Sequence, residues 1–205
     1  MHSQSKRVFF KDLVFLVDEN VYEPAEDSFL FAEHLDVQEH DRVLDMGTGC
    51  GILGIIAAKK AYEVVAIDIN LSAIRCTIQN AKLNNVHNKM IFIQGDLFTA
   101  LRDNEKFDLI FFNAPYLPTE ETEGKSWIER AWSGGLTGRQ VIDHFISKAP
   151  MHLKPSGQIF LLQSTLADVA ETVFKFKNYG LDSCIVAEYP ASFFETITLI
   201  KAKML

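Results

Sequence analysis

Cysteine is scarce in this sequence, and the few cysteines present stand alone. Cys50, Cys76 and Cys184 are widely spaced, and no Cys-x-x-Cys pair occurs. Isolated cysteines in odd number supply neither a disulfide framework nor a zinc knuckle, and the six histidines form no metal-binding pattern. We therefore expect no metal site, and a protein of the reducing cytoplasmic or nucleocytoplasmic compartment.

Long apolar runs and a secretory leader are also missing. The first ten residues, MHSQSKRVFF, contain no apolar stretch followed by a cleavage site. The apolar run over residues 13–17 is far shorter than the roughly 20 residues that cross a bilayer as a helix. No membrane partner is therefore predicted.

Basic residues are outnumbered by acidic ones. The 20 lysines and arginines stand against 27 aspartates and glutamates, which gives a formal net charge of −7. A protein that holds bare nucleic acid through its phosphates needs a surface rich in lysine and arginine. The charge balance therefore argues against direct binding of nucleic acid.

What the sequence does contain is the composition of an ordinary globular domain. The chain has 205 residues, of which 48% are hydrophobic and 23% are charged. A chain of this length can bury a sizeable core. Its composition excludes disorder, collagen and a coiled coil as descriptions of the whole chain. One domain with a small addition is the expected organisation.

Apolar segments of strand length alternate with helical patterns from residue 42 onwards. The expected strands cover residues 42–46, 64–69, 90–94, 108–113, 158–164, 183–187 and 196–201. The expected helices cover residues 52–60, 72–83, 139–149 and 167–177, and residues 115–137 are expected to form a loop. This alternation predicts an α/β fold with a doubly wound, mostly parallel sheet of seven strands. Because no helix separates the last two strands, we expect a terminal antiparallel hairpin with a short proline-containing turn.

The first 40 residues do not follow this alternation of strands and helices. Residues 6–17 alternate and then run apolar, which predicts a strand or a short hairpin. A helical pattern opens at Pro24, with acidic residues in its first turn, where the helix dipole favours them. We expect residues 1–40 to form a lid of strand and helix on a main domain that spans residues 41–205.

A glycine-rich turn follows the first strand of the predicted sheet. The stretch DMGTGCGILG, residues 45–54, ends a strand and opens a helix. Glycine is needed where the backbone approaches a ligand closely or adopts a positive φ. Asp68 ends the next strand, at the place where a ribose diol would lie. A cofactor that carries a nucleoside is therefore expected.

The turn by itself leaves two cofactors open. Residues 49–54 satisfy Gly-x-Gly-x-x-Gly, the dinucleotide fingerprint. Residues 45–51 read Asp-x-Gly-x-Gly-x-Gly, which resembles motif I of class I S-adenosylmethionine-dependent methyltransferases. That resemblance implies that Asp45 lies near the cationic end of the cofactor. It also implies that Asp96, after the third strand, accepts the adenine amino group.

A second motif, NAPY at residues 113–116, ends the fourth strand. That is the carboxyl edge of the sheet, where ligands bind in doubly wound folds. The motif resembles the Asn-Pro-Pro-Tyr motif of methyltransferases that modify planar nitrogens. Together with VYEPAEDS at residues 21–28 and AWSGGLTGR at residues 131–139, it resembles the short eukaryotic and archaeal branch of the HemK/PrmC family. The resemblance runs from about residue 20 to the C-terminus.

This resemblance implies a Rossmann-like class I methyltransferase domain over residues 41–205. It implies S-adenosyl-L-methionine as cofactor and methyl transfer to the Gly-Gly-Gln glutamine of a class I translation release factor. It also implies a heterodimer with a small zinc-binding activator subunit. The predicted strand over residues 90–94 would lie at a sheet edge, and apolar edges need covering. We therefore expect Met90, Phe92 and their apolar neighbours to form the partner surface.

The resemblance also implies roles for individual residues. An amide nitrogen is a poor nucleophile, so a site helps by accepting both of its hydrogens and aiming it at the methyl group. Asn113 and the carbonyl of Ala114 would be these acceptors, Pro115 would hold the local backbone and Tyr116 would cover the amide. The predicted catalytic residues are Asn113, Ala114, Pro115 and Tyr116; the predicted substrate-binding residues are Asn113, Tyr116 and Trp132; and the predicted cofactor-binding residues are Tyr22, Ser28, Asp45, Gly47, Gly49, Gly51, Asp68, Asp96, Leu97 and Asn113.

The chain departs from the family pattern at Ala114, where the family usually has proline. The main-chain carbonyl survives this change, while one constraint on the backbone of Asn113 is lost. Activity is therefore expected to persist.

Other functions remain open on the sequence. The same Asn-x-Pro-Tyr site would serve an adenine-type base-amine methyltransferase acting on nucleic acid, or a protein lysine methyltransferase. From a different class, the chain could be a cofactor-binding subunit without activity, although such a subunit would not need Asn113. An NAD oxidoreductase leaves the NAPY motif unexplained.

Overall fold

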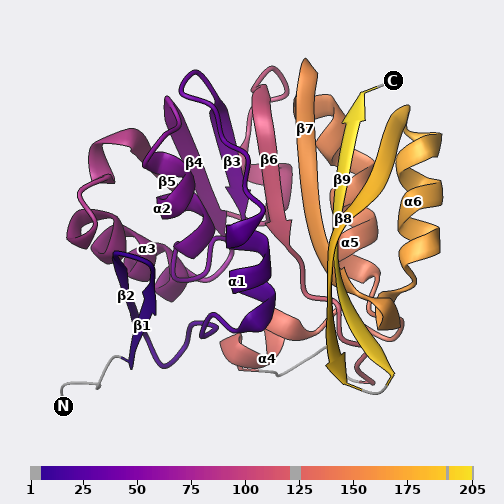
Figure 1. The fold of residues 1–205 in the computed structure, drawn as a ribbon, viewed down its shortest axis with the longest axis horizontal. Coiled ribbons are helices and arrows are strands. Elements are labelled where there is room, and N and C mark those ends of the chain that lie inside the picture. The colour runs from indigo at the N-terminus through magenta and orange to yellow at the C-terminus, as the bar shows by residue number, and fades with distance from the viewer. Residues whose placement is uncertain (1–5, 121–125, 193, 205) are drawn as a thin grey trace.

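The computed structural model describes residues 6–120, 126–192 and 194–204. Its centre is a seven-stranded sheet in the order β5-β4-β3-β6-β7-β9-β8 (Figure 1). The strands are β3 (Arg42–Met46), β4 (Glu63–Asp68), β5 (Met90–Gln94), β6 (Phe107–Asn113), β7 (Leu153–Ser164), β8 (Leu181–Ser192) and β9 (Glu195–Met204). The first five of these pair in parallel, and β9 runs antiparallel to both of its neighbours. The predicted fold class, with its terminal antiparallel hairpin, is confirmed.

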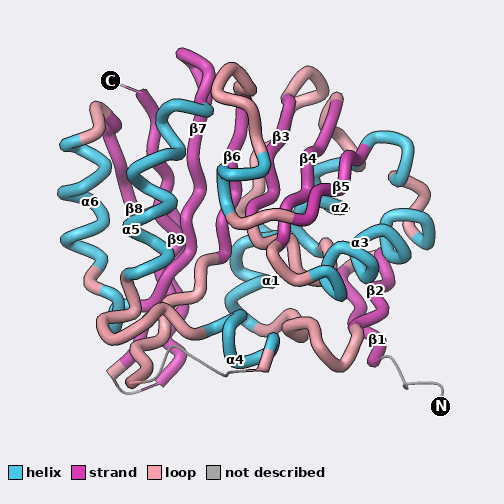
Figure 2. Tube along the Cα trace, turned by 180° about the vertical axis from the view of Figure 1, so that it is seen from behind, coloured by secondary structure: helices cyan, strands magenta, loops and turns pink. Residues whose placement is uncertain are grey.

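Helices cover both faces of the sheet because each strand turns alternate apolar residues to opposite sides. In β3, for example, Val43 packs into one core cluster and Leu44 into the other. The first cluster joins the sheet to α1 (Glu26–Glu33), α2 (Ile52–Ala58) and α3 (Leu71–Leu83), and the second joins it to α5 (Gln140–Lys148) and α6 (Val169–Asn178). Figure 1 shows α1 and α2 in front of the sheet, and Figure 2, from behind, shows α5 and α6.

The N-terminal segment forms a hairpin that is hydrogen-bonded to α3 and the residue that follows it. Strands β1 (Lys6–Phe10) and β2 (Leu13–Val17) pair antiparallel. Asn80 of α3 accepts from the Leu16 N–H at 2.8 Å and donates to the Leu16 carbonyl at 2.8 Å. Asn84 makes the same pair of bonds with Val14, at 3.2 and 2.8 Å. Two asparagines one helical turn apart therefore supply hydrogen-bond partners to the backbone N–H and carbonyl groups at the free edge of β2, as a third strand would.

The segment predicted as a loop contains a helix. Helix α4 spans Trp127–Trp132. It begins with a capping box, in which the Ser126 hydroxyl accepts from the Glu129 N–H at 3.3 Å and the Glu129 carboxylate accepts from the Ser126 N–H at 2.7 Å. The prediction of an unbroken loop over residues 115–137 is therefore wrong. The Ser-x-x-Glu signature was available in the sequence as a helix start.

Pro190 does not lie in a turn as expected. It lies inside β8, opposite Thr196 of β9. Strand β8 is the last in the sheet, and an edge strand tolerates proline because its outer side needs no N–H donor. Strands β7, β8 and β9 are all longer than predicted. Among the residues that the structure describes, none of the helices has the length and hydropathy needed to cross a bilayer.

Candidate active site

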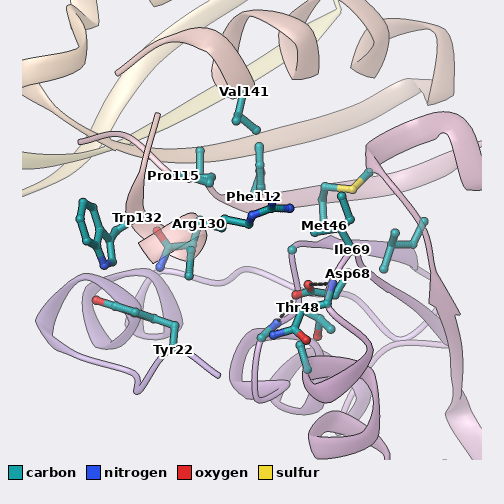
Figure 3. Close-up of a pocket in the computed structure, with 18 of the residues that line it drawn as sticks. Tyr22, Met46, Thr48, Asp68, Ile69, Phe112, Pro115, Arg130, Trp132 and Val141 are labelled. Atoms are coloured by element: carbon teal, nitrogen blue, oxygen red, sulfur yellow. Dashed lines mark hydrogen bonds between the residues drawn. The ribbon is translucent and has the colours of Figure 1, made fainter. Parts of the chain in front are cut away.

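A cavity of about 520 Å³ opens at the carboxyl ends of the parallel strands. Residues of the N-terminal segment and residues at the strand ends line it, and motifs from four parts of the chain meet in it. In Figure 3, Tyr22 and Trp132 lie at one end of the cavity, with Asp68 and Ile69 at the other. The predicted site residues that line it are Tyr22, Ser28, Asp45, Gly47, Gly49, Asp68, Asp96, Leu97, Asn113, Ala114, Pro115, Tyr116 and Trp132.

Gly51 is the one predicted site residue that does not line the cavity. It stands at the N-cap of α2 with a φ of +89°. A Cβ at this position would lie 2.7 Å from the Cγ2 atom of Thr77 in α3. The structure therefore requires glycine here for the backbone conformation and for the packing of α2 against α3.

The buried side chain of Asp45 is hydrogen-bonded to two residues of the glycine-rich turn. The side chain is 1% exposed, and its Oδ2 accepts from the Thr48 hydroxyl at 2.6 Å and from the Gly54 N–H at 2.9 Å. Burial raises the pKa of this carboxyl to about 7, against the opposing effect of the two hydrogen bonds. Asp45 therefore titrates near neutral pH when the cavity holds no cation.

Asp68 ties the end of β4 to the same turn. One carboxylate oxygen accepts from the Gly49 N–H at 2.9 Å and the other accepts from the Asn70 N–H at 2.8 Å. Burial raises the pKa of Asp68, and these two bonds oppose the shift. On the next strand, Asp96 and Leu97 follow β5, and Leu97 has a φ of +45°. A left-handed backbone is unusual for leucine, and residues strained in this way cluster at functional sites.

Asn113 ends β6 beside the N-terminal segment. Its Nδ2 donates to Asp27 at 3.0 Å, and the Tyr22 hydroxyl donates to the same carboxylate at 3.3 Å. Burial is the largest cause of the raised pKa values of Tyr22 and Tyr116, and the charge of Asp27 adds to it. Both phenols therefore stay protonated at neutral pH. Asp27 precedes Ser28, a predicted cofactor-binding residue, in the same motif, but its contact with Asn113 was not predicted.

The segment that follows the NAPY motif (residues 113–116, the tetrad) folds back onto it. Leu117 donates to the Trp132 carbonyl and accepts from the Gly134 N–H, both at 2.9 Å. Gly138 has a φ of +72°, and a Cβ there would collide with the carbonyl oxygen of Tyr116. The glycines of this motif therefore allow two backbone segments to touch, which keeps Tyr116 and Trp132 at the same cavity.

Helix α4 adds two residues that sequence reasoning missed. Trp127 and Arg130 line the cavity, and the Arg130 guanidinium lies 5.2 Å from the Trp127 ring centroid. Figure 3 shows Arg130 between Trp132 and Phe112. The described residues contain no group of three or more histidine, cysteine or acidic side chains that could hold a metal ion.

The chain is similar to several known methyltransferases. The family model for the methyltransferase small domain matches residues 19–131. The chain is 43% identical to a putative protein N5-glutamine methyltransferase of Methanocaldococcus jannaschii, over 87% of this chain and 90% of that protein. It is 33% identical to the methyltransferase HEMK2 of Homo sapiens, over 89% of each. Among solved structures it is similar to a chain of the E. cuniculi Mtq2–Trm112 complex, with a TM-score of 0.69 and 26% identity over 91% of this chain and 99% of that chain.

Proposed function

The chain belongs to the methyltransferase small domain family, in the group of HEMK2 and the N5-glutamine methyltransferases, and from this premise we propose its acceptor. We propose that it transfers a methyl group from S-adenosylmethionine to the Gly-Gly-Gln glutamine of a class I translation release factor. The observation that carries the proposal is the position of Asn113, which ends β6 in the cavity formed by the glycine-rich turn. Because release factors act in translation termination, we place the reaction in the cytoplasm.

The residues around the cavity fit the proposed cofactor. Gly49 has a φ of +59° with no atom within 4 Å of its Cβ position, so the backbone is open to a ligand there. Asp68 would accept from the ribose hydroxyls. Asp96 and the backbone of Leu97 would bind the adenine edge. At the other end, Asp45 supplies negative charge for the cationic part of the cofactor, where Tyr22 and Ser28 would close the site.

The tetrad supplies what an amide acceptor needs. When bound, the cofactor provides an electrophilic methyl group. The Asn113 side-chain oxygen and the Ala114 carbonyl would accept the two N–H hydrogens of the glutamine amide, and Tyr116 would cover its plane. Methyl transfer would break the C–S bond of the cofactor and leave S-adenosylhomocysteine. Positive charge would build on the nitrogen, which then releases one of its two hydrogens as a proton to solvent, and the aimed dipoles would stabilise that charge without a strong base. Holding the nitrogen in line supplies much of the remaining acceleration.

Label transfer from radiolabelled S-adenosylmethionine tests the proposed function. The acceptors are a class I release factor and the same factor with Gln→Ala in its Gly-Gly-Gln motif, each with and without a small zinc-binding activator. Label on the wild-type factor alone is the expected result. No label on either factor, with cofactor binding confirmed by calorimetry, would contradict the proposed acceptor. The same assay would then be run with nucleic acid and with lysine-containing protein.

We propose that the activator pairs with the edge strand β5. The similar E. cuniculi protein is found in a complex with Trm112. Strand β5 ends the sheet, and Ile91 on it is 42% exposed, while Phe92 packs against His87. Met90, expected on this surface, is 7% exposed and points toward Gly54, so that part of the prediction is wrong. A lone chain that is monodisperse and fully active would contradict an activator.

Replacing Ala114 with proline should lower stability slightly and leave activity in place. The Ala114 N–H donates to the Leu162 carbonyl at 3.3 Å, and proline removes that donor. We expect a loss of about 1 kcal/mol, which corresponds to roughly 2–4 °C in Tm for a chain of this size. Calorimetry and label transfer measure the two quantities. A folded Ala114→Pro variant without activity would show that the tetrad backbone differs from the family pattern.

Cofactor affinity should rise with pH up to about 7 and then level off. The Asp45 carboxyl has its pKa raised to about 7, and a cation bound beside it favours the ionised form. Below this pH the free protein must release a proton when the cofactor binds. The cofactor Kd should therefore rise by up to about tenfold for each unit by which the pH falls. The folding stability of the free protein depends on pH in the opposite direction. It falls as pH rises between the ordinary aspartate pKa and 7, because the Asp45 carboxyl loses its proton at a lower pH in the unfolded chain than in the folded one.

Titration calorimetry between pH 5.5 and 8.5, in buffers of different ionisation enthalpy, measures the affinity and the released protons. The Asp45→Asn variant keeps an acceptor for the Gly54 N–H but loses the charge. Its affinity should be lower and should vary less with pH than that of the wild type. A wild-type affinity that is flat across the range would rule out a titrating Asp45.

A further inference from the structure

Asp27 is a buried carboxylate held by neutral donors. It lies in the first turn of α1 and is 6% exposed. Its Oδ1 accepts from the Ser28 N–H at 2.6 Å and the Ser28 hydroxyl at 3.1 Å. Its Oδ2 accepts from the Asn113 Nδ2 at 3.0 Å, and the Tyr22 hydroxyl lies within reach of both oxygens. Among the described residues, no lysine, arginine or histidine forms an ion pair with it.

These contacts decide which way the Asn113 amide faces. The two ends of an asparagine amide have the same shape, but one donates and the other accepts. In every hydrogen bond that the structure gives Asp27 its carboxyl oxygens are the acceptors, so Asn113 turns its Nδ2 toward Asp27. Its Oδ1 then points away from Asp27. In the opposite orientation, two acceptor oxygens would face each other at about 3 Å, which is unfavourable.

We propose that Asp27 is a positioning residue that holds the oxygen of Asn113 toward the methyl acceptor. The inference rests on the proposed function, in which the acceptor is an amide with two N–H hydrogens. Such an acceptor needs an oxygen at residue 113, because an NH₂ group there would face another donor. Asp27 comes from the N-terminal segment, 86 residues away from Asn113 in the sequence. The N-terminal segment therefore completes the acceptor site, and its contribution extends beyond the cofactor end.

The Asp27→Asn variant should reverse the Asn113 amide. The Ser28 N–H is a main-chain donor next to residue 27 and makes the shortest of these bonds. The oxygen of the introduced side chain will therefore stay on Ser28, which leaves its NH₂ group facing Asn113. Asn113 then turns its own oxygen to that NH₂ group and its own NH₂ group to the acceptor. We expect kcat to fall about 10- to 100-fold, as for other misplaced groups, with cofactor Kd changed less than threefold.

A second change should rescue the first. In the Asp27→Asn, Asn113→Asp double variant, residue 113 presents oxygen in either orientation and still accepts from the NH₂ group introduced at residue 27. Its kcat should recover at least fivefold over Asp27→Asn. Asn113→Asp alone places two carboxylates side by side, and its kcat should also be lower than that of the wild type. Asp41→Asn is the matched control, because Asp41 is also buried and accepts from a main-chain N–H but does not line the cavity; its kinetics should equal those of the wild type.

The orientation is also measurable without an acceptor. In ¹⁵N NMR spectra, the Asn113 side-chain NH₂ signal, identified by its loss in Asn113→Ala, should be protected from solvent exchange in the wild type. Asp27→Asn should remove that protection. An unchanged signal would overturn the proposal, as would an Asp27→Asn variant that loses cofactor affinity but keeps kcat. Loss of the NMR protection with no methylation of the release factor by the wild type would count against the proposed function alone.

Discussion

Replacement of Asn113 by alanine is expected to lower the rate of methyl transfer about 100- to 1,000-fold, the usual cost of removing one aimed polar group from a reacting centre. Alanine leaves the Ala114 carbonyl in place but removes the side-chain acceptor for the glutamine amide. The glycine-rich turn, Asp45 and Asp68 are untouched by the change. Cofactor Kd should therefore stay within about threefold of the wild type, since no charged or hydrogen-bonded contact of the turn is lost.

Single-turnover label transfer and titration calorimetry on the same preparation separate the two effects. Asn88→Ala is a suitable control, because Asn88 is exposed and outside the cavity, and it should match the wild type in both assays. Equal losses of cofactor affinity and of turnover would assign Asn113 to cofactor binding and would remove its role as the amide acceptor. Asn113→Ala should also release Asp27 from its amide partner, so the stability of the variant needs to be measured alongside.

Asp68→Ala should have the second large effect, and it should fall on the cofactor. The change removes the acceptor for the Gly49 and Asn70 N–H groups as well as the proposed contact to the ribose. Hydrogen bonds to a charged group contribute about 1.5–3 kcal/mol each, so Kd should rise about 100-fold or more. At saturating cofactor, kcat should remain within about threefold of the wild type, because the acceptor site is unaltered.

The Asp68→Asn variant refines this expectation. An asparagine keeps one acceptor oxygen for either Gly49 or Asn70 and loses the charge, so its Kd should lie between those of the wild type and Asp68→Ala. Calorimetry gives the affinities, and label transfer at several cofactor concentrations gives kcat. An unchanged Kd in Asp68→Ala would show that the cofactor does not reach the end of β4. A fall in kcat as large as the rise in Kd would point to collapse of the glycine-rich turn.

Much of the sheet could be predicted because each strand is recognisable from its own few residues. Strands such as β3, β4 and β5 are short apolar runs bounded by glycine, asparagine and charged residues, and their observed bounds differ from the predicted ones by at most one residue. The antiparallel end of the sheet followed from the absence of a helix between the last two strands. Strand ends were less predictable where pairing continues past the apolar run, as in β8, which extends through Pro190 to Ser192.

The site was predictable in part for the same reason. Gly49 and Asn113 belong to short motifs whose residue types indicate what the motif binds, and both residues line the cavity. Gly51 belongs to the same motif but serves the packing of α2 against Thr77, and residue type does not distinguish these two uses of glycine. Trp127 and Arg130 lie on a short helix that was missed, so no spacing rule connected them to the cavity.

By itself, the amino-acid sequence determined the order of the sheet strands and of the long helices between them, the glycine-rich turn and the NAPY motif at the end of β6, because hydrophobic periodicity and motif spacing act over a few residues. Only the tertiary structure decided that Asn80 and Asn84 bond the edge of β2 and that Asp27 faces Asn113. Those contacts join segments 64 to 86 residues apart. Their formation depends on how whole elements pack, since a hydrogen bond needs its two atoms within about 3 Å, and no local pattern specifies that distance.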